Sequence, residues 1–505
     1  MSNIDKKTKV LLINPPLTGS LSAGIFTVKT PLGLAYIASY LEKHGHELEI
    51  IDCLAYYDEI KELEKGIFRI GLSEEEIIER IKKFKPDLVG ISCSFTVYEE
   101  NSIRIANLVK KNSNAVVVMG GAHSSANPES VLKHKSVDMV AKGEGEIVFL
   151  NIVNNLWNKK KIKSIPGTII LGKNNKLKAN KAAGRVENLD DIPFPARHLL
   201  PMERYLKHPQ NSIANIRGPT TEIISSRGCP YKCIFCSIHT VTGRNWRGRS
   251  PKNVVDELEQ LHNEYGIKEF RFFDDNMTLD RKRTIDICDE IIKRKLDIKW
   301  DTPNGVVIAT LDEEVLRKMK KAGYYRIVMA IESGSERSLV YMKKPLNLKK
   351  AKEIIDICNR LGIWTWSTFV MGFPEETMED INKTINFAKK SGLNFATFYI
   401  AQPYAGTELY EIYQDLGLLD KGIKSGSGVT NTYYDIPNFT AKQLDYFQKK
   451  AYSDFIKYRI ISYLYPKKIH REFINRIRNI EDMGYVLKMI KNLVGKEYSP
   501  IYKKK

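Results

Sequence analysis

The stretch Cys229-Pro-Tyr-Lys-Cys233-Ile-Phe-Cys236 places three thiols within eight residues, directly after an apolar run and an Arg-Gly turn. Iron–sulfur clusters are held by cysteine thiolates, and a cluster of four irons normally takes four of them. Because three cysteines are grouped here, one iron would have no protein ligand and could bind a small molecule. The alternative is a structural zinc site, which needs a fourth Cys or His ligand. His239 is the nearby candidate for that ligand.

The C-x3-C-x2-C spacing, with Phe235 directly before the third cysteine, resembles the signature of the radical S-adenosylmethionine (SAM) superfamily. The resemblance implies that Cys229, Cys233 and Cys236 bind a 4Fe–4S cluster. It also implies that the open iron chelates the amino and carboxyl groups of SAM, and that Phe235 contacts the adenine. An external one-electron reductant of the flavodoxin or ferredoxin type would reduce the cluster.

The composition of the chain predicts a large intracellular protein. At 505 residues it is long enough for about two or three domains. Four further cysteines (Cys53, Cys93, Cys288 and Cys358) stand singly in apolar segments, which indicates buried free thiols and not a disulfide framework. The first residues lack the apolar core of a signal peptide, and no apolar run reaches the roughly 18 residues of a membrane span. We therefore expect a soluble, cytoplasmic protein.

Residues 1–155 alternate apolar runs with amphipathic stretches, the pattern of a doubly wound, Rossmann-like α/β domain with a parallel sheet. The predicted strands are Lys9–Ile13, Glu47–Ile51, Asp87–Ser92, Ala115–Met119 and Asp138–Ala141. Ligands of such sheets bind at the carboxyl ends of the strands. Polar or glycine-containing turns fall at these ends, and their residues are Asn14, Ser92, Ser94, Gly120, Gly121 and His123.

This domain resembles the cobalamin-binding domain that precedes the radical module in one branch of the superfamily. The matching pieces are Asn14-Pro-Pro, Thr30-Pro-Leu-Gly-Leu-Ala, Gly120-Gly-Ala-His123 and Gly143-Glu-Gly-Glu146. The resemblance implies a cobalamin site lined by Asn14, Ser92, Ser94, Gly120, Gly121 and His123. The D-x-H-x-x-G motif that supplies a histidine to cobalt is absent, so we expect cobalt to have no such ligand. The alternative is a similar domain without the cofactor, in which His123 caps a helix.

Residues 156–218 are predicted to form a linker, with a small hairpin around Lys173–Lys176 and a proline-rich strap at Leu189–Arg197. Residues 219–425 then alternate strands with helices, which resembles the partial (β/α)6 TIM-like barrel of the superfamily. The predicted strands are Glu222–Ser226, Glu269–Phe273, Ile298–Asp301, Arg326–Ile331, Thr365–Met371 and Ala396–Ile400. Ser250, which precedes a proline, and Asp280 are predicted to be helix N-caps.

Polar groups follow several strands of this barrel, at the carboxyl ends where barrel enzymes place their chemistry. Asp275 follows the second strand, Glu332 and Ser333 the fourth, and Gly372 the fifth. By resemblance, Glu332 and Ser333 hold the ribose hydroxyls of SAM and Gly372 lets the backbone pack on the adenosyl group. Asp275 is assigned to the same SAM site. Each acid taken alone is equally compatible with a helix N-cap.

Residues 426–505 are predicted to form a helical, basic and aromatic region. From Lys449 to Lys505 the chain carries 15 Lys or Arg against 5 Asp or Glu. The net charge of the whole chain is +19. Arg471, Arg476 and Arg478 alternate with apolar residues, which suits a helix lying on an anionic membrane. The alternative is a helix packed on the core. We predict peripheral contact with the inner face of the membrane, and no nucleic-acid partner because no recognition module is present.

These features predict a cobalamin-dependent radical SAM methyltransferase that acts on a small molecule or lipid. The resemblance implies that a 5′-deoxyadenosyl radical abstracts hydrogen from an unactivated carbon and that methylcobalamin delivers the methyl group. One alternative is a non-methylating cyclase or oxidoreductase on the same scaffold, and another is a non-catalytic cofactor or membrane-binding protein. A tRNA-methylthiolating enzyme is disfavoured, because Cys53 and Cys93 alone precede the motif and the tail is helical.

Overall fold

The computed structural model describes residues 7–19, 28–158, 161–172, 175–208, 215–419, 434–464 and 480–494, and it divides them into two compact units. The first unit takes the described residues up to His208 together with Ser237–Arg247. The second takes the described residues of Pro209–Cys236 and Gly248–Tyr498. The segment Ser237–Arg247, which directly follows the third clustered cysteine, therefore packs with the first unit, whereas the sequence assigned it to the barrel.

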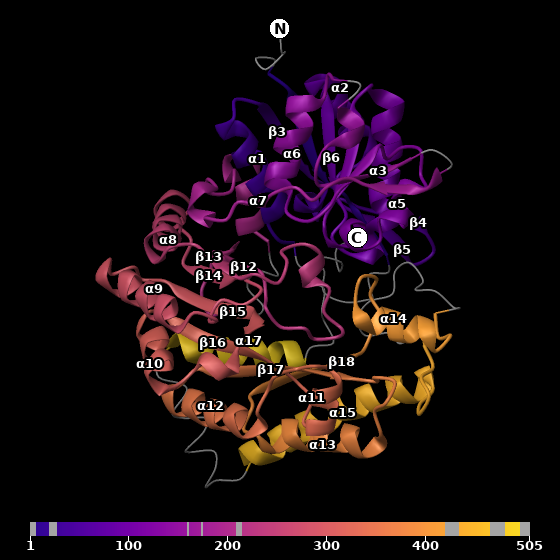
Figure 1. Cartoon of the computed structure of the whole chain (residues 1–505). Coiled ribbons are helices and arrows are strands. Elements are labelled where there is room, and N and C mark those ends of the chain that lie inside the picture. Colours follow the sequence, from indigo (N-terminus) through magenta and orange to yellow (C-terminus); the bar gives the residue numbers. More distant parts are fainter. Residues whose placement is uncertain are drawn as a thin grey trace. The chain divides into compact units, whose positions relative to one another are not determined.

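The first unit, coloured mainly indigo to magenta in Figure 1, is built on a seven-stranded sheet with the order β10-β9-β8-β7-β6-β1-β3. Its strands are β1 (Lys9–Asn14), β3 (Glu47–Asp52), β6 (Leu88–Ser92), β7 (Val116–Gly120), β8 (Met139–Ala141), β9 (Thr168–Leu171) and β10 (Leu177–Ala179). Strands β8 to β3 are parallel, whereas β9 and β10 pair antiparallel at one edge. The strand order reverses between β6 and β1, so the predicted doubly wound α/β class is confirmed.

Helices cover both faces of this sheet because its strands are apolar on both sides. Leu11 and Ile13 pack with α2 (Glu74–Phe84) and α3 (Glu99–Asn112). On the other face, Leu12 and Phe149 approach Gly90, and Phe149 belongs to α6 (Gly145–Asn155), which contacts α1 (Leu32–Lys43). Shorter elements complete the unit: α4 (Ala122–Ala126), α5 (Pro128–Leu132), α7 (Met202–Leu206), β2 (Leu17–Gly19), β4 (Ile60–Glu64) and β5 (Ile67–Ile70).

The small sheet of β2, β5 and β4 was not predicted. Four of the five β4 residues are exposed, so this strand lacks the apolar face by which a strand is found in a sequence. The linker hairpin, in contrast, is confirmed as β9 and β10, although residues 173–174 of its tip lie outside the described part of the chain. It forms the edge of the first sheet, where Ile169 and Ile170 are buried.

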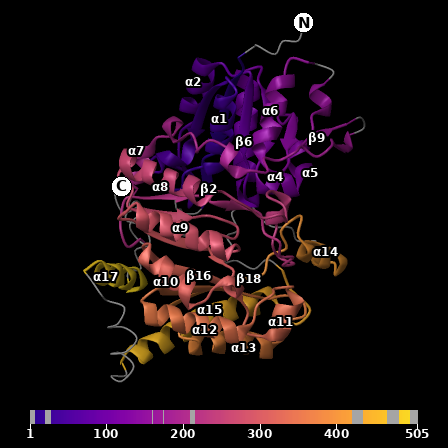
Figure 2. The same ribbon diagram turned by 60° about the vertical axis from the view of Figure 1, so that its left-hand side comes forward.

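The second unit contains a six-stranded parallel sheet with the order β11-β14-β15-β16-β17-β18, and the predicted partial barrel is confirmed (Figure 2). Its strands are β11 (Thr220–Ile223), β14 (Glu269–Phe272), β15 (Lys299–Val306), β16 (Tyr324–Glu332), β17 (Trp364–Met371) and β18 (Phe395–Ile400). Its helices are α8 (Pro251–Tyr265), α9 (Arg281–Lys293), α10 (Glu313–Lys321), α11 (Glu336–Tyr341), α12 (Leu348–Leu361), α13 (Met378–Lys390), α14 (Glu408–Asp415), α15 (Ala441–Leu464) and α17 (Ile480–Val494).

Two helix starts predicted from the sequence are confirmed. The Ser250 hydroxyl accepts a hydrogen bond from the Asn253 amide at 3.2 Å, and the following proline occupies the first turn of α8 without losing a bond. The Asp280 carboxylate accepts from the Arg283 amide at 2.9 Å and caps α9. Asp280 is therefore a structural acid.

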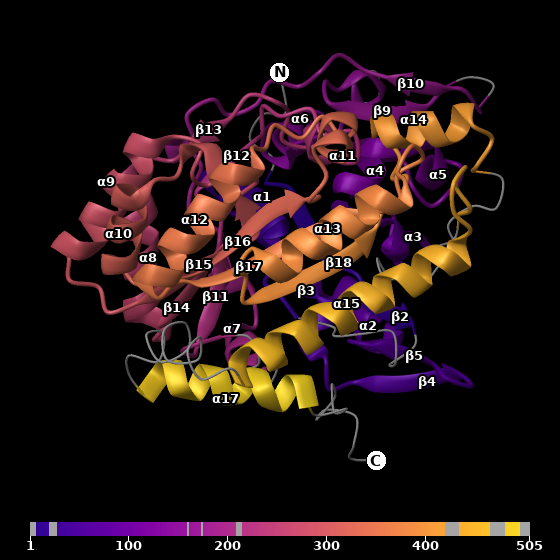
Figure 3. The same ribbon diagram turned by 90° about the horizontal axis from the view of Figure 1, so that it is seen from below.

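The carboxyl-terminal helices belong to the barrel scaffold. Helix α15 runs along β18 (Figure 3), and the Gln448 side chain donates to the Phe398 carbonyl at 2.7 Å. In α17, Tyr485 is buried, its ring lies 5.4 Å from that of Trp364 at the start of β17, and its hydroxyl accepts from Arg326 at 3.2 Å. Helix α17 therefore covers the amino-terminal end of the barrel. No helix of the described ranges is long and apolar enough to cross a membrane.

Candidate functional site

The three clustered cysteines lie on a loop of the second unit that backbone bonds hold in place. The Gly228 amide donates to Asp275 Oδ2 at 2.8 Å, directly before the first cysteine. In the middle of the loop, the buried Ile234 donates to the Met342 carbonyl at 3.1 Å and accepts from the Leu409 amide at 2.9 Å. The three thiols themselves remain partly exposed. The loop is thus anchored through its backbone.

The two interpretations of these thiols require different ligand geometries. A zinc site needs its ligands grouped around one metal, and the described residues contain no group of three His, Cys, Asp or Glu side chains that could hold one ion. A cubane cluster instead binds each thiolate to a different iron, so its cysteines need not converge on a point. His239, the candidate fourth zinc ligand, packs with the first unit.

The predicted SAM residues lie at the carboxyl ends of three barrel strands, near the cysteine loop. Glu332 ends β16 with φ at +66°, is buried, and accepts from the Thr368 hydroxyl at 3.2 Å. Lys344 lies 3.9 Å from the Glu332 carboxylate. Burial raises the pKa of both Glu332 and Cys233, and the Lys344 ammonium opposes the rise in both. One lysine therefore favours the charged forms of a predicted SAM contact and a predicted cluster ligand.

Phe235 points its ring toward the loop after β17. Its centroid lies 5.9 Å from that of Phe373, which in turn lies 6.2 Å from Tyr341. Gly372, directly before Phe373, has φ at +87°, a conformation that disfavours a side chain. The ring of Phe235 and the Gly372 turn are thus brought together, which is consistent with their predicted contact with one adenosyl group.

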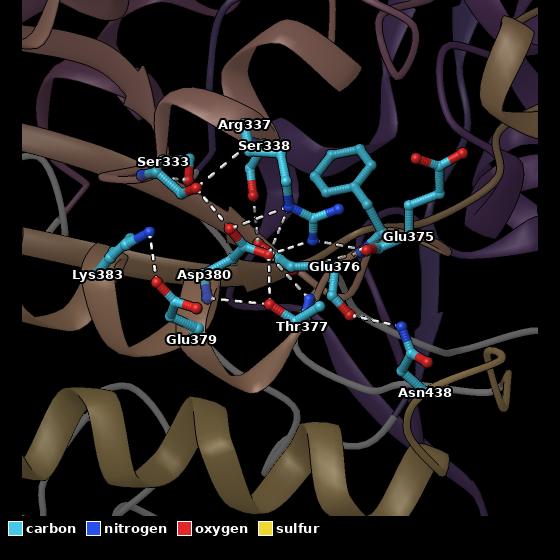
Figure 4. A network of polar contacts seen from close by, with 12 residues as sticks. Ser333, Arg337, Ser338, Glu375, Glu376, Thr377, Glu379, Asp380, Lys383 and Asn438 are labelled. Atoms are coloured by element: carbon cyan, nitrogen blue, oxygen red, sulfur yellow. Dashed lines mark hydrogen bonds and ion pairs between the residues drawn. The ribbon is translucent and has the colours of Figure 1, made fainter.

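A polar network fixes the loops after β16 and β17 (Figure 4). Asp380 accepts from Ser335 and Thr377 at 2.6 Å each and pairs with Arg337. Ser333 is fully buried, and its hydroxyl lies 2.9 Å from that of Thr384. Because this hydroxyl already has a protein partner, the contact of Ser333 with ribose stays a prediction.

Glu376 fixes the Gly372 turn through two hydrogen bonds from backbone amides. Its carboxylate accepts from the Gly372 amide at 2.6 Å and from the Phe373 amide at 3.4 Å. Burial raises the pKa of Glu376 to about 7 from an ordinary value of 4.5, although these two amides oppose the rise. Glu375, the residue before it, is exposed.

The raised pKa of Glu376 predicts a pH dependence of stability. Between about pH 4.5 and 7 the folded chain binds the Glu376 proton more tightly than the unfolded chain, so the unfolding free energy falls as pH rises through this window. We expect a contribution on the order of 1–3 kcal/mol. Denaturant unfolding at pH 5 to 8 should show a smaller fall for Glu376→Gln than for Glu375→Gln. Equal pH profiles for the two variants would contradict the assignment.

In the first unit, the predicted cobalamin residues lie at the carboxyl edge of the parallel sheet. Asn14 ends β1 and donates to Asp52 at 2.7 Å, and Ser92 ends β6 with its hydroxyl 3.3 Å from that of Ser94. Gly120 ends β7. Gly121 has φ at +111°, and a Cβ there would lie 2.8 Å from the Cys93 carbonyl oxygen, so the turn requires glycine. The sheet therefore brings these side chains and turns to one edge.

His123 is held by the protein through both ring nitrogens. Nε2 lies 2.6 Å from the Glu99 carboxylate and Nδ1 lies 3.1 Å from the Thr96 hydroxyl, and the side chain is buried. Burial tends to raise the pKa of Glu99, but hydrogen bonds from His123 and Ser130 hold it below its ordinary value. In this arrangement neither nitrogen of His123 is available to a metal.

Several partners of the site residues have no signal in the sequence. Asp52 is fully buried, bonds to Asn14 and Tyr205, and has a pKa raised by burial to about 6. Glu144, in the Gly-Glu-Gly-Glu stretch, forms a buried ion pair with Arg247. Lys344 approaches Glu332 only after the chain has passed through α11. The turn after each strand can be read from the sequence, whereas partners that come from distant elements cannot.

Two family models match the chain: the B12 binding domain over residues 25–153 and the radical SAM superfamily over residues 223–388. An uncharacterized methyltransferase of Pyrococcus horikoshii is 34% identical over 96% of this chain and 97% of its own length. The chain belongs to the B12-binding branch of the radical SAM superfamily. Membership in this family of enzymes implies a 4Fe–4S cluster, SAM and cobalamin as cofactors.

Two further relatives are named for different reactions. Cytidylyl-2-hydroxyethylphosphonate methyltransferase of Streptomyces wedmorensis is 33% identical over 79% of this chain and 80% of its own. The anaerobic magnesium-protoporphyrin IX monomethyl ester cyclase of Rubrivivax gelatinosus is 29% identical over 77% of this chain and 66% of its own.

Solved structures share the fold at low identity. The radical SAM methyltransferase TsrM of Kitasatospora setae, with tryptophan and a SAM analogue bound, matches with a TM-score of 0.66 and 18% identity over 84% of this chain and 80% of that one. The cobalamin-dependent SAM radical enzyme OxsB with aqua-cobalamin bound matches with a TM-score of 0.69 and 15% identity over 97% and 80%. Both agree with a doubly wound domain followed by a partial barrel.

Proposed function

We propose that this chain methylates an unactivated carbon of a small molecule, using a 4Fe–4S cluster, SAM and cobalamin. The observation that carries the proposal is similarity along the length of the chain to two relatives named methyltransferases, at 34% and 33% identity. When bound, the cluster and SAM supply a 5′-deoxyadenosyl radical, and cobalamin carries the methyl group. A flavodoxin or ferredoxin type of protein is the proposed electron donor.

Each group of residues has a role in this proposal. Cys229, Cys233 and Cys236 hold the cluster, and Asp275 positions their loop through the Gly228 amide. Glu332 accepts hydrogen bonds from the ribose of SAM, helped by the nearby Lys344. Phe235 and the Gly372 turn enclose the adenosyl group, with Ser333 fixing the loop beside them. The turns at Asn14, Ser92, Ser94, Gly120 and Gly121 receive cobalamin.

The cobalt is expected to have no histidine below it, because Glu99 and Thr96 occupy both nitrogens of His123. Electron paramagnetic resonance of the cob(II)alamin form should therefore show no nitrogen superhyperfine splitting from a lower ligand. His123→Ala and the control His134→Ala should leave that spectrum unchanged. A nitrogen triplet in the parent protein that disappears in His123→Ala alone would show that the histidine rotates to the metal.

The cyclase alternative rests on the relative from Rubrivivax gelatinosus, of which this chain spans 66%. The inert-carrier alternative predicts that SAM is bound but not cleaved. Anaerobically reconstituted protein with excess reductant should convert SAM to 5′-deoxyadenosine over many turnovers, and this separates an enzyme from a carrier. Absence of 5′-deoxyadenosine from protein that contains cluster and SAM would remove the proposed function.

Docking on an anionic membrane is the second part of the proposal, and its clearest basic residues (Arg471, Arg476 and Arg478) lie outside the described residues. The outer face of α17 supports it, because Ile480 and Leu487 are 85% and 62% exposed. Helix α17 lies at the amino-terminal end of the barrel, opposite the strand ends that carry the site residues. Docking there would not by itself bring a lipid to the site, so we favour a small-molecule substrate.

Vesicle co-sedimentation tests this docking. Each Lys or Arg near an anionic surface contributes on the order of 1 kcal/mol, so binding should require anionic lipid and weaken as salt rises. Changing Arg471, Arg476 and Arg478 to Gln should release the protein from the vesicles. A parent protein that stays in the supernatant at low salt would leave the tail with a structural role.

A further inference from the structure

The barrel interior contains a half-buried arginine, Arg271, with fewer hydrogen bonds than the buried Arg326 and Arg283. Alternate residues of a strand point to opposite faces of a sheet. Phe272 of β14 lies 5.0 Å from Trp300, whose indole donates to the Ala322 carbonyl directly after α10, so this row of residues faces the helices. Arg271, the neighbour of Phe272, therefore points into the barrel.

Arg271 belongs to a layer of inward charges that runs across four strands. The strand register pairs Glu222 with Arg271, Arg271 with Asp301, and Asp301 with Arg326. Arg326 is buried. Its Nε donates to Asp301 Oδ2 at 2.9 Å, and its Nη1 donates to the Tyr485 hydroxyl. The guanidinium of Arg326 also lies 5.9 Å from the ring of Trp366, which places Trp366 in the same interior.

The contacts of Arg271 are sparse. Its Nε faces Asp301 Oδ1 at 3.6 Å, beyond hydrogen-bonding distance, and is itself buried without an acceptor. Within the described ranges, its side chain donates no hydrogen bond. By contrast, the buried Arg283 donates to the Arg249 and Ser225 carbonyls at 2.6 Å each.

A guanidinium with five N–H donors is costly to leave unsatisfied in a protein interior. The side chain of Arg271 is 18% exposed, so part of its guanidinium is accessible. Two half-buried side chains of β17 follow toward the strand end: Trp366, which donates to Thr397 at 2.8 Å, and Thr368, which donates to Glu332. The planar fork of arginine matches a carboxylate or phosphate group in a bidentate contact.

We propose that the substrate carries an anionic carboxylate, phosphate or phosphonate group that binds Arg271, with Trp366 beside the body of the molecule. This inference rests on the proposed function, because it names the substrate class of the same barrel. It disfavours a wholly apolar lipid, which would leave the Arg271 guanidinium without an acceptor. Arg271 is thus a specificity-determining residue.

The carboxylate of SAM is the other anion that could reach a barrel arginine. Glu332, which we assign to its ribose, follows Arg326 by six residues on β16, or roughly 20 Å along a strand. Arg271 lies in the layer of Arg326. The two anions are therefore expected at different depths, and the experiment separates them.

The test uses full-length protein, reconstituted with cluster and cobalamin and labelled with 5-fluorotryptophan, with the Trp366 signal identified in Trp366→Phe. Methylphosphonate should shift this fluorine signal, whereas its neutral dimethyl ester should not. Arg271→Gln should weaken methylphosphonate binding by about tenfold or more, the equivalent of losing a charged hydrogen bond. Arg281→Gln, on the surface of α9, should bind as the parent does. Equilibrium dialysis should show unchanged SAM binding in Arg271→Gln.

Three results would overturn the assignment: a parent protein that ignores methylphosphonate, an Arg271→Gln variant that binds it as tightly as the parent, or a tenfold loss of SAM binding in that variant. A loss of SAM binding would mean that Arg271 binds the carboxylate of SAM. If Arg271→Gln fails to fold, Arg271→Lys retains the charge without the planar fork and should bind methylphosphonate less tightly than the parent. Cleavage of SAM to 5′-deoxyadenosine is measured separately, so failure of the proposed function is distinguished from failure of this inference.

Discussion

Replacing Cys229, Cys233 and Cys236 together by alanine is expected to remove all bound iron and sulfide and to abolish cleavage of SAM. The reason is that these thiols share one anchored loop, whereas the other cysteines (Cys53, Cys93, Cys288 and Cys358) are buried outside it. Burial raises the pKa of Cys288 and Cys93, which disfavours the thiolate form that binds iron.

Iron and sulfide analysis of anaerobically purified protein measures this directly. Cys288→Ala is the matched control, because it removes a thiol of the same unit that lies outside the loop, and it should retain the full cluster. A triple variant that still binds iron and sulfide at the level of the parent would show that the cluster lies elsewhere.

Asp301→Ala is expected to cost about 3–5 kcal/mol of stability, because it leaves the buried Arg326 without its main partner. Asp301 and Arg326 are both almost completely inaccessible to solvent, so water cannot replace the lost carboxylate. Denaturant unfolding, followed by circular dichroism on protein without its cofactors, measures the change.

The double variant Asp301→Leu with Arg326→Met separates an unpaired charge from a loss of packing. Because it removes both charges and fills the space, its cost should be well below that of Asp301→Ala. A single variant that loses less than about 1 kcal/mol would mean that Arg326 finds another partner or reaches solvent.

The fold was predictable because both sheets alternate apolar strands with amphipathic helices, and the strands of the parallel sheets fall close to the predicted ranges. Helix starts at Ser250 and Asp280 were predictable because capping is local in the sequence. The small sheet of β2, β5 and β4 was not, because β4 is exposed along most of its length and β2 and β5 are only three and four residues long. The packing of Ser237–Arg247 with the first unit includes the pair of Arg247 with Glu144, about a hundred positions away, which the sequence does not indicate.

The residues of the candidate site also differ in whether local sequence patterns reveal them. Residues at strand ends, such as Glu332 and Gly121, could be named from the pattern of strands and turns. Lys344 and Glu99 could not, because each meets its partner only when separate elements pack together. Arg271 was read simply as part of a strand, and only the register of β14 with β15 shows that it points into the barrel without a hydrogen-bond acceptor among the described residues.

The most direct test of the central claim follows the methyl group. Reconstituted protein is supplied anaerobically with reductant, SAM deuterated in its methyl group, and a small-molecule extract of the source cells. The account predicts that 5′-deoxyadenosine forms, and that one extract component gains a deuterated methyl group on carbon only when cobalamin is present. Formation of 5′-deoxyadenosine with a product that never acquires the label, with or without cobalamin, would contradict it and favour the cyclase type of reaction.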